Sequence, residues 1–175
     1  MKKVKFNQRY GHHQAIITGK KIQFHQVEKR LINYLAENYP TSKIDRLDMP
    51  VSWEECDKIA VHLTCGASFQ YTPAYRIGEI LEVVGTRGKV QIRITNIHIE
   101  RLCNATAKEV LNEGLFKMKI DTYNQYCYND LETNDVIYFR THCQAWISQL
   151  YRLYDSDLVL SNPYSVVYEF EKVES

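Results

Sequence analysis

The sequence predicts an α+β domain built on a small, strongly bent β-barrel with two to four flanking helices. Two observations indicate this class: short runs of alternating apolar and polar residues, and stretches with apolar residues at helical spacing. A third is a long alternating segment that changes phase, as a strand does when it turns the corner of a barrel. The 175 residues suffice for one compact domain. We expect a single domain over residues 1–175, with an insertion at about 27–72.

The N-terminal part alternates between strand and helix patterns. Val4 and Phe6 alternate with lysines, which predicts a short strand. Residues 9–18 have helical spacing and end at Gly19, a typical residue just beyond a helix. Residues 21–25 alternate again and predict a strand, and residues 27–38 return to helical spacing.

The next segment is less regular. Residues 40–56 mix prolines, serines and charges, which predicts an irregular insertion. Two alternating runs within residues 58–72 predict a hairpin, and residues 80–84 predict another strand. Gly85 and Gly88 bracket a predicted tight connection into the longest strand pattern of the chain.

That pattern, "KVQIRITNIHIERL", changes phase at Thr95-Asn96 and so predicts a bulge or sharp bend. Thr106 and Glu109 then match a capping box, which opens a short helix that stops at Gly114. Residues 117–138 are polar and rich in tyrosine, and no element is assigned to them.

The C-terminal part combines a helix and a strand. Residues 139–153 predict an amphipathic helix docked on the sheet, with Trp146 on its apolar stripe and therefore in the core. Asn162-Pro163 predicts an interruption of regular secondary structure, and "YSVVYEFEKV" predicts the last strand.

The composition is that of an ordinary globular protein, with 45% hydrophobic and 25% charged residues. No apolar run approaches the roughly 20 residues that cross a bilayer, and the first residues lack the apolar core of a signal peptide. We therefore expect a cytoplasmic protein, in a bacterium or a phage-infected cell, without a membrane partner. Five cysteines and six histidines are scattered without metal-ligand spacing, so no metal site, disulfide framework or cofactor is predicted.

Charge is unevenly distributed although the net charge is only +1. Residues 1–30 hold eight Lys/Arg against Glu28 alone, a balance of +7, whereas residues 104–175 hold six Lys/Arg against eleven Asp/Glu, a balance of −5. This asymmetry suggests a local anion-facing surface, or charges distributed only for solubility. The turn at Gly19-Lys20-Lys21 has the same two interpretations. It is either a solvated turn or a turn that aims one amine into a pocket for an anionic or carbonyl ligand.

Four segments, in this order, resemble the ASCH domain family of the PUA-like group. They are "TGKK", "YRIGEILEV", "ITNIHIERLCNATAKEVLNEGL" and "SNPYSVVYEFE", and they lie within about half of the chain. The longer arrangement also resembles ASCH-like proteins of gut Bacteroidetes and their phages. The resemblance implies a cleft between the Gly-Lys-Lys turn and the Glu-Gly helix end, suited to a nucleotide or single-stranded RNA.

Some members of that family hydrolyse the acetyl amide of acetylated cytidine, and some cleave RNA. The lysine and glutamate of the hydrolase match Lys21 and Glu113, which are the catalytic residues that the resemblance implies. Its threonine falls on Phe24, and many relatives have Thr-Arg-Arg where this chain has Phe24-His25-Gln26. Losing a hydroxyl donor and an arginine weakens substrate orientation and phosphate binding, whereas Phe24 can stack on a base.

Two functions therefore stay open. The first is an RNA- or nucleoside-binding domain with a lysine-lined cleft. The second is an amidohydrolase of acylated nucleosides of the N4-acetylcytidine type, which uses Lys21 and Glu113. The expected nucleic-acid-binding residues are Lys20, Lys21, Phe24, Arg76 and Tyr126. Against these roles, the charged residues are equally suited to a solvated surface, and the tyrosines around Tyr126 to an ordinary strand. The expected partner is RNA or a modified nucleoside.

Overall fold

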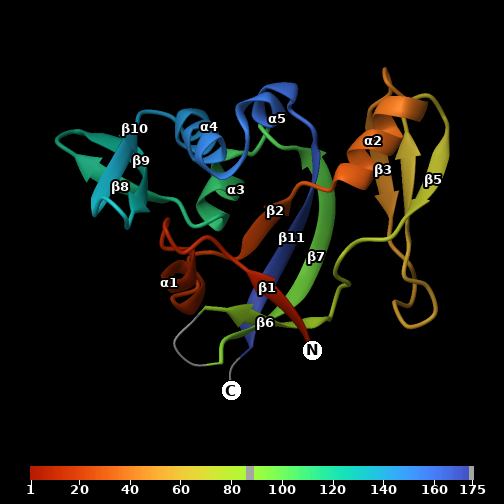
Figure 1. Cartoon of the computed structure of the whole chain (residues 1–175), viewed down its shortest axis with the longest axis horizontal. Coiled ribbons are helices and arrows are strands. Elements are labelled where there is room, and N and C mark those ends of the chain that lie inside the picture. Colours follow the sequence, from red (N-terminus) through yellow and green to blue (C-terminus); the bar gives the residue numbers. More distant parts are fainter. Residues whose placement is uncertain (86–88, 174–175) are drawn as a thin grey trace.

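The computed structural model describes residues 1–85 and 89–173, and it has an α+β fold. The described elements are eleven strands in three sheets and five helices (Figure 1). The strands are β1 (Lys2–Lys5), β2 (Gln23–Gln26), β3 (Ile44–Asp48), β4 (Ile59–Leu63), β5 (Ser68–Tyr71), β6 (Ile80–Val84), β7 (Gln91–Arg101), β8 (Phe116–Ile120), β9 (Tyr123–Asp130), β10 (Asp135–Phe139) and β11 (Tyr164–Val173). The helices are α1 (His12–Ile17), α2 (Lys29–Asn38), α3 (Ala107–Asn112), α4 (His142–Leu153) and α5 (Ser156–Ser161).

The central sheet has the strand order β1-β6-β7-β11-β2. Strand β1 runs parallel to β6, and the other neighbours are antiparallel. Among the described residues β1 and β2 are the edge strands, and no pairing between them closes the sheet. The α+β class is therefore confirmed, whereas the predicted closed barrel is not. The long strands β7 and β11 are curved, so the sheet is strongly bent but open (Figure 1).

The phase change predicted at Thr95-Asn96 is a β-bulge. Asn96 lies opposite Glu169, and Ile94 lies opposite Phe170, so Thr95 is the additional residue between two consecutive positions of β11. The bulge lets apolar residues on both sides of it face the same core, because it offsets the two-residue period of the strand by one. Ile92, Ile94 and Ile97 are all buried accordingly.

The insertion between α1 and β6 is more regular than predicted. Besides the expected helix α2 and hairpin β4–β5, it contains strand β3 within the segment expected to be irregular. Strand β3 pairs with β4 and packs Ile44 and Leu47 against the main core. The sequence pattern of β3 is weak, because these two residues are the only apolar ones in a charged strand. Pairing with β4 stabilises it.

The segment over residues 117–138, left unassigned, forms most of the antiparallel meander β8-β9-β10, with helix α4 lying against it (Figure 1). Phe139 ends β10 instead of starting the helix, because Thr141 caps α4 in a capping box with Gln144. The short helix α5 was not predicted. The predicted connection between Gly85 and Gly88 falls largely outside the described residues. No helix in the described ranges combines the length and apolarity needed to span a bilayer.

Two apolar clusters stabilise the fold. The larger one joins the central sheet to α2 and the β3–β5 sheet, so the insertion shares the main core. The smaller one lies between α3, α4 and the β8–β10 meander and includes Trp146 and Leu150, both buried. The prediction that Trp146 is a core residue is confirmed.

Replacing Leu150 by alanine is expected to lower the free energy of unfolding by about 2 to 5 kcal/mol, because it leaves a cavity in the smaller cluster. Denaturant unfolding followed by circular dichroism measures this change. Leu160→Ala is the matched control, since Leu160 is 71% exposed and its truncation should cost less than about 0.5 kcal/mol. Equal effects of the two substitutions would contradict the assignment of the smaller cluster.

Candidate functional site

The backbone brings Lys21 against Glu113. After α1, Gly19 adopts a left-handed conformation with φ of 70°, and the Lys21 N–H donates to the Ala15 carbonyl. Lys21 and Glu113 then form an isolated antiparallel β-bridge. Gly114 permits this approach: its φ is 99°, and a Cβ there would lie 3.3 Å from the Cβ of Lys21. The two glycines thus join distant segments of the chain.

The Lys21 amine is held by two acceptors of Glu113. Its Nζ donates to the Glu113 carboxylate Oε2 at 2.5 Å and to the Glu113 backbone carbonyl at 2.8 Å. Both side chains are buried, with 1% and 5% exposure. An ammonium group has three N–H donors. Two donate to Glu113, and the third N–H has no hydrogen-bond acceptor among the described residues, although the Phe6 ring lies 5.7 Å from Nζ.

His25 extends this pair into a chain of charges. Its Nδ1 donates to Glu113 Oε1, and its Nε2 donates to Glu100 Oε1, both at 2.6 Å. Burial alone would lower the pKa of His25, but the two carboxylates outweigh it and raise the pKa to about 9. The imidazole ring also packs on Trp146, with the ring centroids 5.0 Å apart. His25 is therefore a buried cation between two carboxylates.

The same contacts determine the ionisation of Glu113 and Lys21. Burial acts to raise the pKa of Glu113, yet the charges of Lys21 and His25 lower it to about 2. Burial lowers the pKa of the Lys21 amine, against the opposing effect of Glu113. We call Lys21, His25, Glu100 and Glu113 the charge cluster. With all four groups ionised it is neutral, which makes its burial tolerable.

The charge cluster borders a cavity of about 380 Å³, here called the inner cavity. Its walls include the aromatic side chains of Phe6, Phe24, Tyr75, Trp146 and Tyr154, and its polar groups come from several elements. His12 is neutral because burial, reinforced by Lys21, lowers its pKa to about 3. Tyr154 keeps its hydroxyl proton, because burial and the charge of Glu113 raise its pKa to about 12. The lining residues are Val4, Lys5, Phe6, Asn7, His12, Lys21, Phe24, His25, Gln26, Tyr75, Glu113, Trp146, Leu153 and Tyr154.

The structure brings together Lys21 and Glu113, the two residues that the resemblance implied as catalytic. Phe24 also lines the inner cavity, but it is a core residue whose ring stacks on Tyr168 at 5.1 Å. Lys20, Arg76 and Tyr126 do not line it. Lys20 is exposed, Arg76 binds the Trp53 carbonyl and Tyr126 lies under Lys117. Only part of the predicted site is therefore gathered around one cavity.

Sequence reasoning missed four polar residues of the site: His12, His25, Glu100 and Tyr154. The sequence identifies His25 only as a departure from the Thr-Arg-Arg pattern of the family. Its position four residues after Lys21 was a usable signal, because an even spacing on a predicted strand places both side chains on the same face. Glu100 and Tyr154 carried no such signal, since only the folded chain places them near His25 and Glu113.

One group of potential metal ligands occurs among the described residues. His98, Glu100 and Glu109 present ligand atoms within 4.8 Å of one another. The Glu109 carboxylate already accepts the Thr106 N–H in the capping box of α3, and Glu100 accepts from His25. These contacts account for the position of both carboxylates without an ion.

Comparison with known proteins returns no match: no family model, no curated protein and no solved structure is similar to this chain. The resemblance of its four segments to the ASCH domain therefore stays a prediction. The function of the site is argued below from its geometry and chemistry.

The raised pKa of His25 makes stability depend on alkaline pH. A group whose pKa is higher in the folded state contributes stability below its unfolded value of about 6.5, and this contribution is lost as pH rises through about 9. The free energy of unfolding should fall by roughly 3 kcal/mol between pH 6.5 and 9.5. His25→Gln should show a flatter dependence, measured by urea unfolding at each pH. His142→Gln, outside the charge cluster, should keep the wild-type slope, and an unchanged slope in His25→Gln would refute the assignment.

Proposed function

We propose that the inner cavity binds the base of a nucleoside or of one nucleotide of an RNA strand. The observation that carries this proposal is the buried Lys21 amine, which keeps one N–H donor free at a cavity walled by aromatic rings. The resemblance to the ASCH family, with its PUA-like barrel and its nucleoside- or RNA-related functions, supports the same ligand class.

A nucleobase fits the chemistry of this cavity. A volume of about 380 Å³ falls within the range of small-molecule sites. The free N–H of Lys21 can donate to a base carbonyl, and the Tyr154 hydroxyl supplies a second donor. Phe6, Tyr75 and Trp146 offer ring faces or edges to a flat ligand. The charge cluster is neutral overall, so a neutral carbonyl suits it better than a free anion.

Binding of cytidine and of N4-acetylcytidine to the purified protein is expected, measured by isothermal titration calorimetry. Lys21→Met should weaken binding at least tenfold, because it removes the donor to the base carbonyl; one such hydrogen bond is worth about 1.5 kcal/mol. Tyr154→Phe should weaken binding by a smaller factor, because this substitution removes only a hydroxyl from a half-buried side chain.

Lys119→Met is the matched control, since Lys119 is an exposed lysine on β8 outside the inner cavity. Circular dichroism and a thermal melt of each variant separate lost binding from lost folding. If neither nucleoside binds the wild-type protein, or if Lys119→Met weakens binding as much as Lys21→Met, the proposal fails.

Amide hydrolysis is the second candidate, and the buried amine favours it. Because burial lowers the pKa of Lys21, its neutral form becomes accessible as a proton acceptor. Water would then attack the acyl carbon while Lys21 takes the water proton. The C–N bond would break as Lys21 returns that proton to the leaving amine, which gives a carboxylic acid and the free nucleoside. Tyr154 can donate to the oxyanion in place of the family threonine, whose position Phe24 occupies.

Turnover of N4-acetylcytidine, followed by chromatography of the released cytidine, tests this second candidate. If the reaction occurs, Lys21→Met should abolish it, and Tyr154→Phe should lower kcat by about 10- to 100-fold with a smaller effect on KM. Binding of N4-acetylcytidine without any release of cytidine would exclude hydrolysis of this substrate and leave the binding function.

A further inference from the structure

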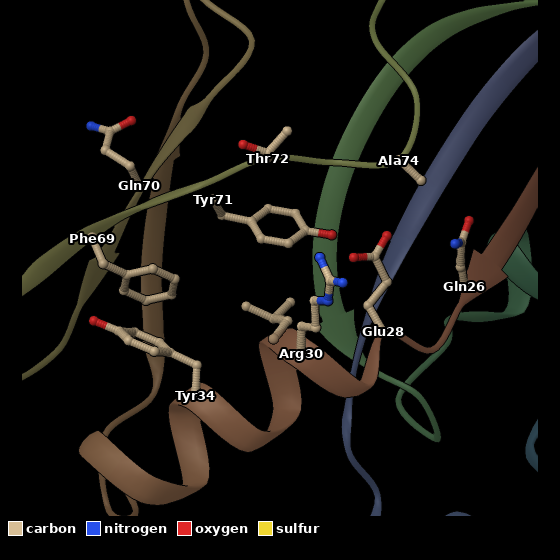
Figure 2. Close-up of a pocket in the computed structure, with 10 residues that line it drawn as sticks. Gln26, Glu28, Arg30, Tyr34, Phe69, Gln70, Tyr71, Thr72 and Ala74 are labelled. Atoms are coloured by element: carbon tan, nitrogen blue, oxygen red, sulfur yellow. The ribbon is translucent and has the colours of Figure 1, made fainter.

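A second cavity, of about 640 Å³, adjoins the inner cavity, and we call it the outer pocket. Figure 2 shows its lining side chains. The pocket lies between the start of α2, strand β5 and the segment that follows β5. It is lined by Gln26, Glu28, Arg30, Leu31, Tyr34, Phe69, Gln70, Tyr71, Thr72 and Ala74. Most of these residues belong to the insertion, so this pocket depends on a part of the chain outside the four ASCH-like segments.

The two cavities share a boundary. Gln26 lines both of them, and the consecutive residues Ala74 and Tyr75 line the outer pocket and the inner cavity, respectively. Within the described ranges the side-chain amide of Gln26 makes no hydrogen bond. A ligand that spans both cavities would pass this amide, which offers it a donor and an acceptor.

The outer pocket contains a buried polar group that forms no hydrogen bond among the described residues. Tyr71 is 8% exposed, and its hydroxyl makes no such bond although the Glu28 carboxylate and the Tyr168 hydroxyl are its neighbours. Figure 2 shows this hydroxyl directed toward the Glu28 carboxylate, with the Arg30 guanidinium nearby. Burial raises the pKa of the Tyr71 phenol, and the charge of Glu28 adds to the effect, so the hydroxyl stays a donor. A buried donor left unpaired costs about 1 to 3 kcal/mol, which a ligand acceptor would recover.

The polar groups of the outer pocket match the edge of a base that carries an amino group. Within the described part of the chain the Glu28 carboxylate accepts one long hydrogen bond, from Tyr168 at 3.5 Å, so it has capacity for ligand donors. Tyr71 donates next to it, which gives a donor beside an acceptor. Guanine presents two adjacent donors, its ring N–H and its amino group, beside a carbonyl acceptor, which suits the two oxygens of a carboxylate next to a hydroxyl donor, whereas uracil presents a single N–H. Phe69, Tyr34 and Tyr71 supply aromatic surface, and the exposed Arg30 can meet a phosphate.

We infer that the outer pocket is a second base subsite, so that the ligand is a segment of at least two nucleotides and not a free nucleoside. The base in the inner cavity is that of the proposed function, on which this inference rests. The neighbouring base occupies the outer pocket with its amino edge on Glu28 and Tyr71. The insertion thereby selects a strand over a monomer and a guanine over a uracil.

Calorimetric titration of the full chain with cytidine and with the dinucleotides CpG, GpC, CpU and UpC tests the inference. At least one guanine-containing dinucleotide should bind tenfold or more tightly than cytidine, because a stacked base contributes about 1 to 3 kcal/mol. The uracil-containing dinucleotides should bind less tightly than their guanine counterparts. Glu28→Gln and Tyr71→Phe should each reduce the gain from the second base and leave the affinity for cytidine unchanged.

The variants also separate a ligand role from a structural one. Tyr71→Phe removes an unpaired buried hydroxyl, so the ligand-free variant should melt at or above the wild-type temperature while its dinucleotide affinity falls. Glu37→Gln, an exposed glutamate of α2 outside the outer pocket, is the matched control for Glu28→Gln and should change nothing.

Each failure has its own signature. If all dinucleotides bind only as tightly as cytidine, the second subsite is refuted and the proposed function stands. If guanine- and uracil-containing dinucleotides exceed the affinity of cytidine by the same factor, and Glu28→Gln does not change that factor, the assignment of the amino-edge contact is wrong. If no nucleoside or dinucleotide binds at all, the proposed function fails, and the inference fails with it.

Discussion

The site depends on the Glu113 carboxylate, which accepts two hydrogen bonds. One of its oxygens accepts from Lys21 and the other from His25, so one side chain of the segment after α3 holds the loop before β2 and the strand itself. Removing one partner of such a buried pair typically costs about 3 to 5 kcal/mol, because the other charge stays buried without compensation. The α3 capping box and Gly114 serve the same contact, since they determine where this helix begins and ends.

This arrangement gives the inner cavity an unusual electrostatic character. Two carboxylates and two cations are joined by one series of hydrogen bonds, so their charges balance locally, and five aromatic side chains line the cavity beside them. A free phosphate would find no net positive charge in the cluster. A neutral heterocycle with a carbonyl acceptor would instead find one directed N–H, a protonated tyrosine hydroxyl and several rings. The phosphates of a strand would then stay near the exposed lining residues Lys5 and Arg30.

The insertion encloses the outer pocket beside the charge cluster and its cavity. Its helix α2 and strand β5 share the apolar core of the central sheet, and they enclose the outer pocket beside the inner cavity. Because Gln26 ends β2 and Glu28 precedes α2, the short connection between these elements carries polar groups of both cavities. The sharing of a core explains how an added segment can position a ligand-binding wall rigidly against the sheet.

Local patterns in the sequence determined most of the elements. Alternation predicted β6 and β11, the change of phase predicted the bulge at Thr95, and the Thr106 capping box predicted α3. These features depend on interactions between residues close in the chain, and for that reason they can be read from it. The resemblance to a known family, rather than any local pattern, suggested that Lys21 and Glu113 act together.

Only the tertiary structure decided the rest. The central sheet is open and not a closed barrel, since closure depends on whether the edge strands β1 and β2 meet. The tyrosine-rich meander is stable through its pairing and its packing on α4. The ionisation of His25 follows from Glu100 and Glu113, which lie 75 and 88 residues away in the chain. Solvent exposure and electrostatic partners are properties of the folded arrangement, so the chemistry of the site could not be derived from residue types alone.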